Sequence, residues 1–149
     1  MNEPTPLARP RGSGTTYHVL GDVVTCIVGG QETGNAWSLF EVEVPTESGP
    51  PLHFHEAYDE ALYVLEGELE VYLGDKTVIA GPGQFFFVPR GTPHGFRNRN
   101  ANPARFLSWA MPSGAEHFFA EMDRSFATTP PDTAKVLEIA ARHRTHALL

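Results

Sequence analysis

Short apolar runs, interrupted repeatedly by glycine and proline, are the feature that most restricts the fold of this chain. Val23–Val28, Trp37–Val44 and Leu62–Leu65 are rich in β-branched or aromatic residues, or alternate apolar with polar positions. Clusters of glycine and proline separate such runs at intervals of about 8–12 residues, a spacing typical of β-sandwiches and β-barrels. The pattern therefore predicts an all-β domain.

The two ends of the chain depart from this pattern. Residues 1–14 are rich in proline and glycine, which indicates a flexible N-terminal arm. The segment Ser113–Phe126 has apolar residues at helical spacing, with Ser113 placed to cap the helix and Glu116 to complete a capping box. A second helix is expected to begin at about residues 130–133. The expected organisation is an arm (1–14), a β-barrel (15–112) and a helical tail (113–149).

Composition limits the classes of partner. The chain has 11 Lys and Arg residues against 18 Asp and Glu residues, and this net charge of −7 opposes binding to nucleic acid. Cys26 is the only cysteine, so neither an intrachain disulfide nor a cysteine-based metal site can form. No apolar run approaches the ~18 residues of a membrane helix, and the N-terminus lacks the apolar core of a signal peptide. We expect a soluble, cytoplasmic protein without a membrane partner.

Histidine is then the remaining soft metal ligand, and three histidines fall within the predicted β region. His53 and His55 are two residues apart, so in a strand both imidazoles point to one face, about 6.6–7 Å apart. Glu60 begins the next apolar segment, and His94 follows a proline-rich corner, so both could reach the same point. Three imidazoles and one carboxylate suit Fe, Mn, Co, Ni, Cu or Zn. Other carboxylates near the histidines remain alternatives to Glu60.

These residues resemble the cupin superfamily. Two segments are similar to its two sequence motifs, and they read His53-x-His55-x4-Glu60-x6-Gly67 and Gly83-x5-Pro89-x-Gly91-x2-His94-x3-Asn98. The family usually has a glycine five residues before the first histidine, whereas only three residues separate Gly49 from His53. The resemblance covers about residues 21–122. Within the superfamily, the chain looks like small bacterial single-domain proteins described as quercetin-dioxygenase-like.

The resemblance implies a double-stranded β-helix, a jelly-roll-like barrel with the C-terminal helices packed outside it. Its spacing favours Glu60 over Glu56 and Asp59 as the carboxylate ligand. Gly67 and Asn98 are interpreted as turn residues rather than as parts of the site. One divalent transition metal is therefore expected on the four ligands His53, His55, Glu60 and His94.

The apolar neighbours of these ligands predict where a substrate would lie. By strand alternation, Leu62 and Val64 share the face of Glu60, and Phe96 shares the face of His94. These three residues are the candidates for a substrate pocket. A second apolar surface, formed by Phe85 and Phe87 or by Leu107, Trp109 and Met111, favours a homodimer.

The resemblance favours a metal-dependent dioxygenase that acts on a small aromatic or enolic metabolite, within secondary metabolism. Glu60 would then be both a metal ligand and the catalytic base that takes the substrate proton. The same ligand set also allows a non-redox enzyme, such as a metal-dependent polyketide cyclase or isomerase. A ligand-binding cupin without turnover is the third alternative.

Overall fold

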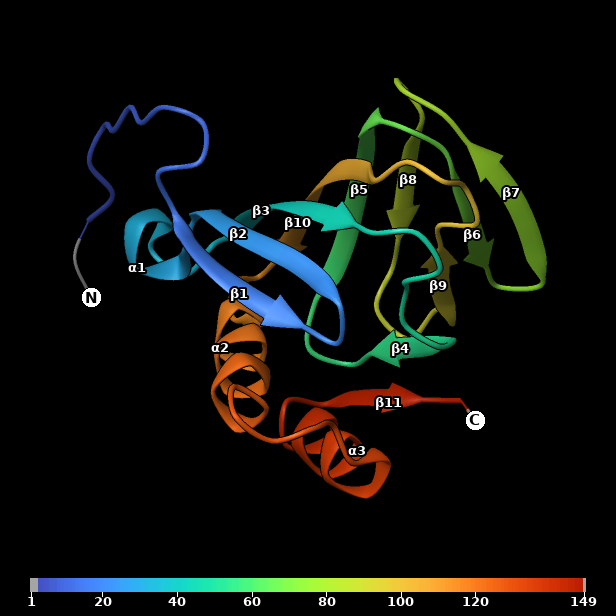
Figure 1. The fold of residues 1–149 in the computed structure, drawn as a ribbon. Coiled ribbons are helices and arrows are strands. Elements are labelled where there is room, and N and C mark those ends of the chain that lie inside the picture. Colours follow the sequence, from blue (N-terminus) through green and yellow to red (C-terminus); the bar gives the residue numbers. More distant parts are fainter. Residues whose placement is uncertain (1–2, 149) are drawn as a thin grey trace.

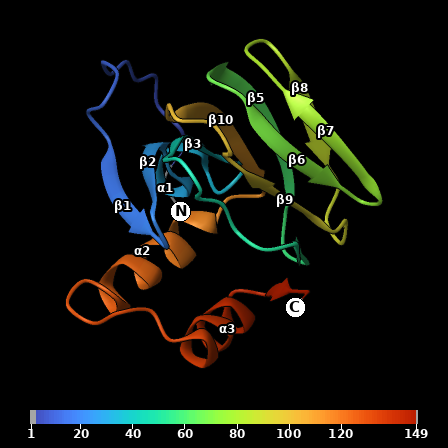
Figure 2. The same cartoon turned by 45° about the vertical axis from the view of Figure 1, so that its right-hand side comes forward.

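The computed structural model describes residues 3–148, which form two facing antiparallel sheets with the two longer helices below them (Figures 1 and 2). One sheet has six strands in the order β1 (Thr15–Val19), β2 (Asp22–Val28), β3 (Ser38–Val44), β10 (Ala104–Met111), β5 (Asp59–Glu66) and β8 (Phe85–Val88). The other has five, in the order β11 (Thr145–Ala147), β4 (His53–His55), β9 (His94–Arg97), β6 (Leu69–Leu73) and β7 (Lys76–Ala80). The prediction of an all-β double-stranded β-helix is confirmed.

The core lies between the two sheets. In β3 and β10, buried and partly exposed residues alternate without interruption, as expected for strands with one face on the core. The largest fully buried side chains include Phe40 and Phe106 from the six-stranded sheet and Leu69 from the five-stranded sheet. Removal of this apolar surface from water is the main force that holds the sheets together.

Two residues of the motifs stabilise the barrel. Gly67 has a φ of +75°, and a Cβ added there would lie 2.8 Å from the Cα of Ala104, so no other residue fits without displacement. Asn98 is fully buried, and its side-chain amide donates to the carbonyl oxygens of Val44 (2.9 Å) and Asn102 (2.8 Å). Both residues have the turn-stabilising role predicted from the sequence.

The tail contains both expected helices, α2 (Ala115–Ser125) and α3 (Thr133–Arg142), but the predicted cap of the first helix is wrong. The N-cap residue of α2 is Gly114. Ser113 instead packs against Gly30, where an added Cβ would lie 2.3 Å from the Ser113 Oγ. The Glu116 carboxylate accepts from the backbone N–H groups of Gly30 (2.7 Å) and Gly114 (2.8 Å), which ties α2 to the short helix α1 (Gly30–Thr33).

The helical tail ends in a strand that the sequence analysis did not predict. β11 pairs antiparallel with β4, and Thr145 lies opposite His55. α2 and α3 lie outside the sheets, as expected, and the chain after α3 returns to the edge of the five-stranded sheet (Figure 1). Within residues 3–148, no helix combines the length and apolar character needed to cross a membrane.

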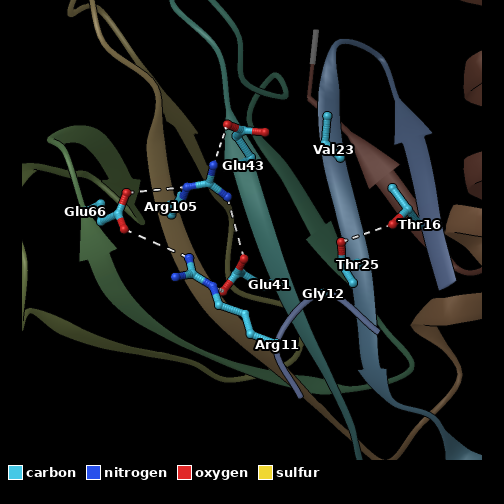
Figure 3. A pocket seen from close by; sticks show the side chains of 9 residues that line it. All are labelled: Arg11, Gly12, Thr16, Val23, Thr25, Glu41, Glu43, Glu66 and Arg105. Carbon is cyan, nitrogen blue, oxygen red and sulfur yellow. Dashed lines mark hydrogen bonds and ion pairs between the residues drawn. The ribbon is translucent and has the colours of Figure 1, made fainter. Parts of the chain in front are cut away.

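The N-terminal segment, residues 3–14, has neither helix nor strand. Arg9 donates to the backbone oxygen of Ile27 (2.6 Å), and the Nε of Arg11 donates to the Glu41 carboxylate (3.0 Å). Arg11 thereby joins a surface cluster in which Arg105 pairs with the acids of neighbouring strands, including Glu43 at 2.9 Å (Figure 3). These contacts place the segment against the six-stranded sheet, and its flexibility stays a prediction.

The outer face of the six-stranded sheet is aromatic near its β8 edge. Phe86 points into the core, whereas Phe85 and Phe87 are 57% and 51% exposed. Across the strands, Phe87 lies opposite Ala61 and Phe85 opposite Tyr63, and β10 continues the two rows with Trp109 and Leu107. The two apolar groups considered from the sequence thus belong to one continuous outer face.

Candidate metal centre

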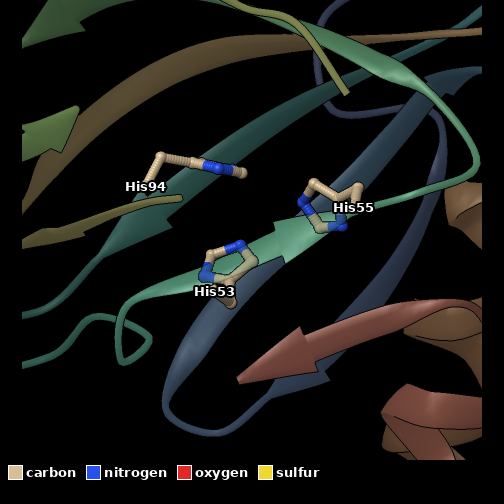
Figure 4. Close-up of side chains that lie close together, drawn as sticks. All are labelled: His53, His55 and His94. Carbon is tan, nitrogen blue, oxygen red and sulfur yellow. The ribbon is translucent and has the colours of Figure 1, made fainter. Parts of the chain in front are cut away.

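Three histidines meet at one end of the five-stranded sheet. His53 and His55 come from β4 and point to the same side, and His94 begins the neighbouring strand β9, opposite His53 in the register. One nitrogen from each imidazole lies within 4.8 Å of the other two, and the rings surround a common point (Figure 4). His55 and His94 are buried, and His53 is partly buried. The predicted convergence of the three histidines is therefore present in the fold.

Glu60 reaches the histidines from the opposite sheet. Its Oε2 lies 3.2 Å from the Nε2 of His55 and 3.1 Å from the Nε2 of His94. Its Oε1 accepts a hydrogen bond from the Ser108 hydroxyl at 3.1 Å, and the side chain is 14% exposed. The cluster therefore joins β5 of one sheet to β4 and β9 of the other.

The two rival carboxylates point elsewhere. Glu56 pairs with Arg144 at 3.4 Å, and Asp59 accepts from the backbone N–H (2.9 Å) and the guanidinium (3.1 Å) of Arg90. Both acids are thus held in ion pairs at the protein surface. Of the three acids, the structure brings only Glu60 to the histidines.

Each imidazole is held at the ring nitrogen that faces away from the cluster. The Nδ1 atoms of the three histidines have these partners: the Pro51 carbonyl for His53 (2.9 Å), the Thr145 hydroxyl for His55 (2.8 Å) and the Thr92 carbonyl for His94 (2.9 Å). A carbonyl only accepts, so the Nδ1 atoms of His53 and His94 carry protons. Their Nε2 atoms are then the nitrogens able to bind a metal. Metal-binding histidines typically have this outer hydrogen bond.

The charges of the cluster also favour a cation. Burial alone would raise the pKa of Glu60, but hydrogen bonds from His55 and His94 outweigh it, and the pKa lies well below its usual range. Burial, together with the neighbouring imidazoles, lowers the pKa of His53 to about 3, so this ring stays neutral. These hydrogen bonds place a proton between the Nε2 atoms and the ionised carboxylate, and a bound metal cation would take the place of such protons. These residues therefore fit a divalent transition metal.

Two residues that the sequence analysis missed support His55. The Tyr58 ring stacks on the His55 ring with centroids 4.4 Å apart, and its hydroxyl lies 3.4 Å from the His55 Nε2. Burial raises the pKa of Tyr58 well above its usual value, so the hydroxyl is neutral. Thr145, the hydrogen-bond partner of His55, comes from β11, 90 residues further along the chain. No local pattern points to Thr145, whereas the position of Tyr58 beside the first motif could have indicated it.

A cavity of about 150 Å³ opens from this cluster. Phe96 lines it, as predicted, but Leu62 and Val64 do not. Both point inward as strand alternation requires, yet they are 5% and 1% exposed and belong to the packed core, further along β5 from Glu60. The cavity wall is instead completed by residues of the tail, which was expected only to pack outside the barrel: Val136, Leu137, Ala140, Thr145 and Ala147.

Fold and site together define a two-sheet β-barrel with a histidine-rich centre between its sheets. Residues 40–110 match the Cupin domain family. The chain belongs to the cupin superfamily, as the two sequence motifs indicated.

Named relatives differ in chemistry. The chain is 27% identical over 131 residues to quercetin 2,3-dioxygenase of Bacillus subtilis, a match that covers 87% of this chain and 39% of that protein. It is 37% identical over 105 residues to germin-like protein 1-1 of Oryza sativa, with 66% of this chain and 47% of that protein covered. The chain therefore spans less than half the length of both proteins.

Among solved structures, the polyketide cyclase RemF from Streptomyces resistomycificus is 29% identical with a TM-score of 0.65. That match covers 73% of this chain and 81% of the cyclase. The comparisons thus include one protein named as an oxygenase and one named as a cyclase.

Proposed function

We propose that this protein is a metal-dependent cupin enzyme, a dioxygenase that acts on a small aromatic or enolic metabolite. The observation that carries the proposal is the convergence of three imidazoles and Glu60 at the edge of an apolar cavity, which His53, His55 and Glu60 line. Four protein ligands, His53, His55, Glu60 and His94, leave coordination positions that a purely structural metal would not need. The likeness to quercetin 2,3-dioxygenase supports oxygenase chemistry.

Each residue has a distinct role in this proposal. A bound metal supplies Lewis acidity toward an enolate or phenolate oxygen, and a redox-active metal adds reactivity toward dioxygen. Glu60, ionised and anchored by Ser108, takes the proton of the substrate hydroxyl. The neutral Tyr58 hydroxyl, beside His55, donates a hydrogen bond to the substrate oxygen. The apolar cavity excludes water, which strengthens each of these interactions.

The second candidate is a non-redox polyketide cyclase or isomerase. Its support is the match to RemF, which covers 81% of the cyclase, whereas the match to the dioxygenase covers only 39% of that protein. A metal on the same four ligands would then stabilise an enolate, and dioxygen would take no part in the reaction. A ligand-binding role without turnover is the weakest alternative, since it gives no reason for a complete set of metal ligands.

An oxygen-uptake assay separates these candidates. Protein loaded in turn with Fe, Mn, Co or Ni is mixed with flavonols and 1,3-diketones in an oxygen electrode, with His94→Ala as the control. Oxygen uptake by the wild type alone supports the dioxygenase. Product formation without oxygen, followed by mass spectrometry, would favour the cyclase or isomerase. Absence of both reactions would leave only the binding role.

We also propose that the protein is a homodimer that pairs through the aromatic outer face around Phe85 and Phe87. Together with Tyr63, these side chains expose aromatic surface to water beside the open sheet edge of β8. Such exposure is unfavourable and would be relieved by pairing with a second copy of the chain. Light scattering at micromolar concentration should give twice the mass of the chain, and Phe87→Lys should give the monomer. A monomer mass for the wild type would contradict the proposal.

A further inference from the structure

The cavity contains a second buried carboxylate, outside the histidine cluster. Asp22 begins β2 and lines the same cavity as Glu60, but it is only 8% exposed. β2 is separated from β5 by two strands, β3 and β10, so the two carboxylates occupy different parts of the cavity wall. Asp22 therefore has no direct place in the metal centre.

The hydrogen bonds of Asp22 leave one of its oxygens free. Its Oδ1 accepts from the Ser48 hydroxyl at 2.6 Å. Among residues 3–148, no other group bonds to this carboxylate, and no Lys, Arg or His pairs with it. A carboxylate accepts up to about four hydrogen bonds, so Asp22 retains acceptor capacity.

Most of the surroundings of Asp22 in the cavity are apolar. Leu20 and Val24 precede and follow it in the cavity wall, and Pro50 and Phe96 line the same space. Burial of a charge among such groups is costly unless hydrogen bonds compensate for it. Burial raises the pKa of Asp22 to about 6, and the hydrogen bond from Ser48 offsets this only in part. A purely structural tie between β2 and Ser48 would be made as well by a neutral side chain.

We propose that Asp22, supported by Ser48, recognises a hydrogen-bond donor, such as a hydroxyl group, on the part of the substrate remote from the metal. This inference rests on the proposed function, because the chelating part of the substrate must occupy the metal centre. It narrows the substrate class to a compact enol or phenol that carries a second polar group. A cavity of about 150 Å³ is close to the size that holds one benzene ring, which agrees with a compact substrate.

Two ring compounds that differ by one oxygen atom test the inference. Kojic acid and allomaltol chelate metals through the same hydroxyketone. Across the ring from these oxygens, kojic acid has a hydroxymethyl group where allomaltol has a methyl group. Binding of both compounds to Zn-loaded protein is measured by calorimetry for the wild type, Asp22→Asn and the Asp22→Val/Ser48→Ala double variant. Asp75→Asn, in an exposed turn outside the cavity, is the control.

The wild type and the control should bind kojic acid about 10-fold more tightly than allomaltol, as expected for a hydrogen bond to a charged group. Asp22→Asn should reduce this ratio, and the double variant should bring it to one or below with little change for allomaltol. Equal binding of the two compounds by the wild type would overturn the role of Asp22. If neither compound binds to protein that holds one metal per chain, the proposed function fails, and the inference fails with it.

Discussion

The histidine–Glu60 cluster and Asp22 border the same cavity, but they differ in how many hydrogen bonds their side chains make within the protein. In the metal centre, each of His53, His55 and His94 has a partner for its outer nitrogen, and Glu60 contacts two imidazoles and Ser108. Asp22, in contrast, has a single hydrogen bond, from Ser48. The difference shows which group is already prepared for its ligand. The side chains of the candidate metal centre are held in place by contacts within the protein, whereas the proposed role of Asp22 needs a donor from outside the protein.

The barrel and the C-terminal tail contribute different contacts to the histidine–Glu60 cluster. His53, His94 and Glu60 are held by contacts within the barrel. His55 contacts Tyr58 of the barrel, but the partner of its Nδ1 atom is Thr145 in β11. The tail also lines the cavity through α3. The tail is therefore part of the site as well as a cover for the barrel.

The largest effect is expected from the loss of a metal ligand. His55→Ala should lower metal affinity by more than about 100-fold, because even the loss of an outer hydrogen bond costs about 10–100-fold. Competition with a chromophoric chelator measures this affinity. The control is His117→Ala, which removes an exposed histidine on α2. Equal affinity in His55→Ala and the control would show that His55 is not a ligand.

Glu60→Gln tests the role of the carboxylate as a base. Turnover should fall by about 100-fold or more, since a positioned general base contributes about 10²–10⁴-fold. The affinity for substrate should change much less in variant protein that is reloaded with metal. Steady-state kinetics alongside binding calorimetry make the comparison. Equal losses in turnover and in affinity would mean that Glu60 only binds.

Asp22→Asn should stabilise the metal-free protein at high pH. The pKa of Asp22 is raised from 3.8 to about 6 in the folded state, because burial favours the protonated carboxyl. The stability that the protonated form contributes is therefore lost as the pH rises from about 4 to about 6. A shift of this size corresponds to at most ~3 kcal/mol. Urea unfolding in EDTA should show the variant to be more stable than the wild type at pH 8 and nearly equal at pH 4. No gain at pH 8 would mean that the buried carboxylate is not costly.

The smallest effect is expected from the support that β11 provides. Thr145→Val removes the hydroxyl that contacts the Nδ1 of His55 and should weaken metal binding about 10-fold. Thr145→Ser keeps the hydroxyl and should restore most of the affinity. If both variants bind metal like the wild type, the contact with Thr145 has no part in metal binding.

Much of the barrel could be predicted from the sequence because its signals are local. Strand alternation and glycine–proline turns located the strands, and the spacing of His53, His55, Glu60 and His94 located the cluster. The choice of Glu60 over Glu56 and Asp59 depended on family spacing, and the structure agrees with it, because the other two acids form surface ion pairs.

The features that could not be predicted depend on contacts distant in sequence. Strand parity placed Leu62 and Val64 inside the barrel, but parity does not reveal where packed core ends and cavity begins. β11 is three residues long, and it exists because β4 offers it an edge. No sequence pattern singles out Asp22, because nothing in the sequence shows that it lies in the same cavity as Glu60.

The most direct test of the central claim is the metal itself. Elemental analysis of protein purified without a histidine tag, followed by X-ray absorption spectroscopy, should find about one divalent transition metal per chain. Its shell should contain imidazole nitrogens, with distances near 2.0–2.1 Å if the metal is zinc. Protein that holds no metal after exposure to Fe, Mn, Co, Ni, Cu and Zn, or that holds one without imidazole ligands, would contradict the assignment of His53, His55, Glu60 and His94.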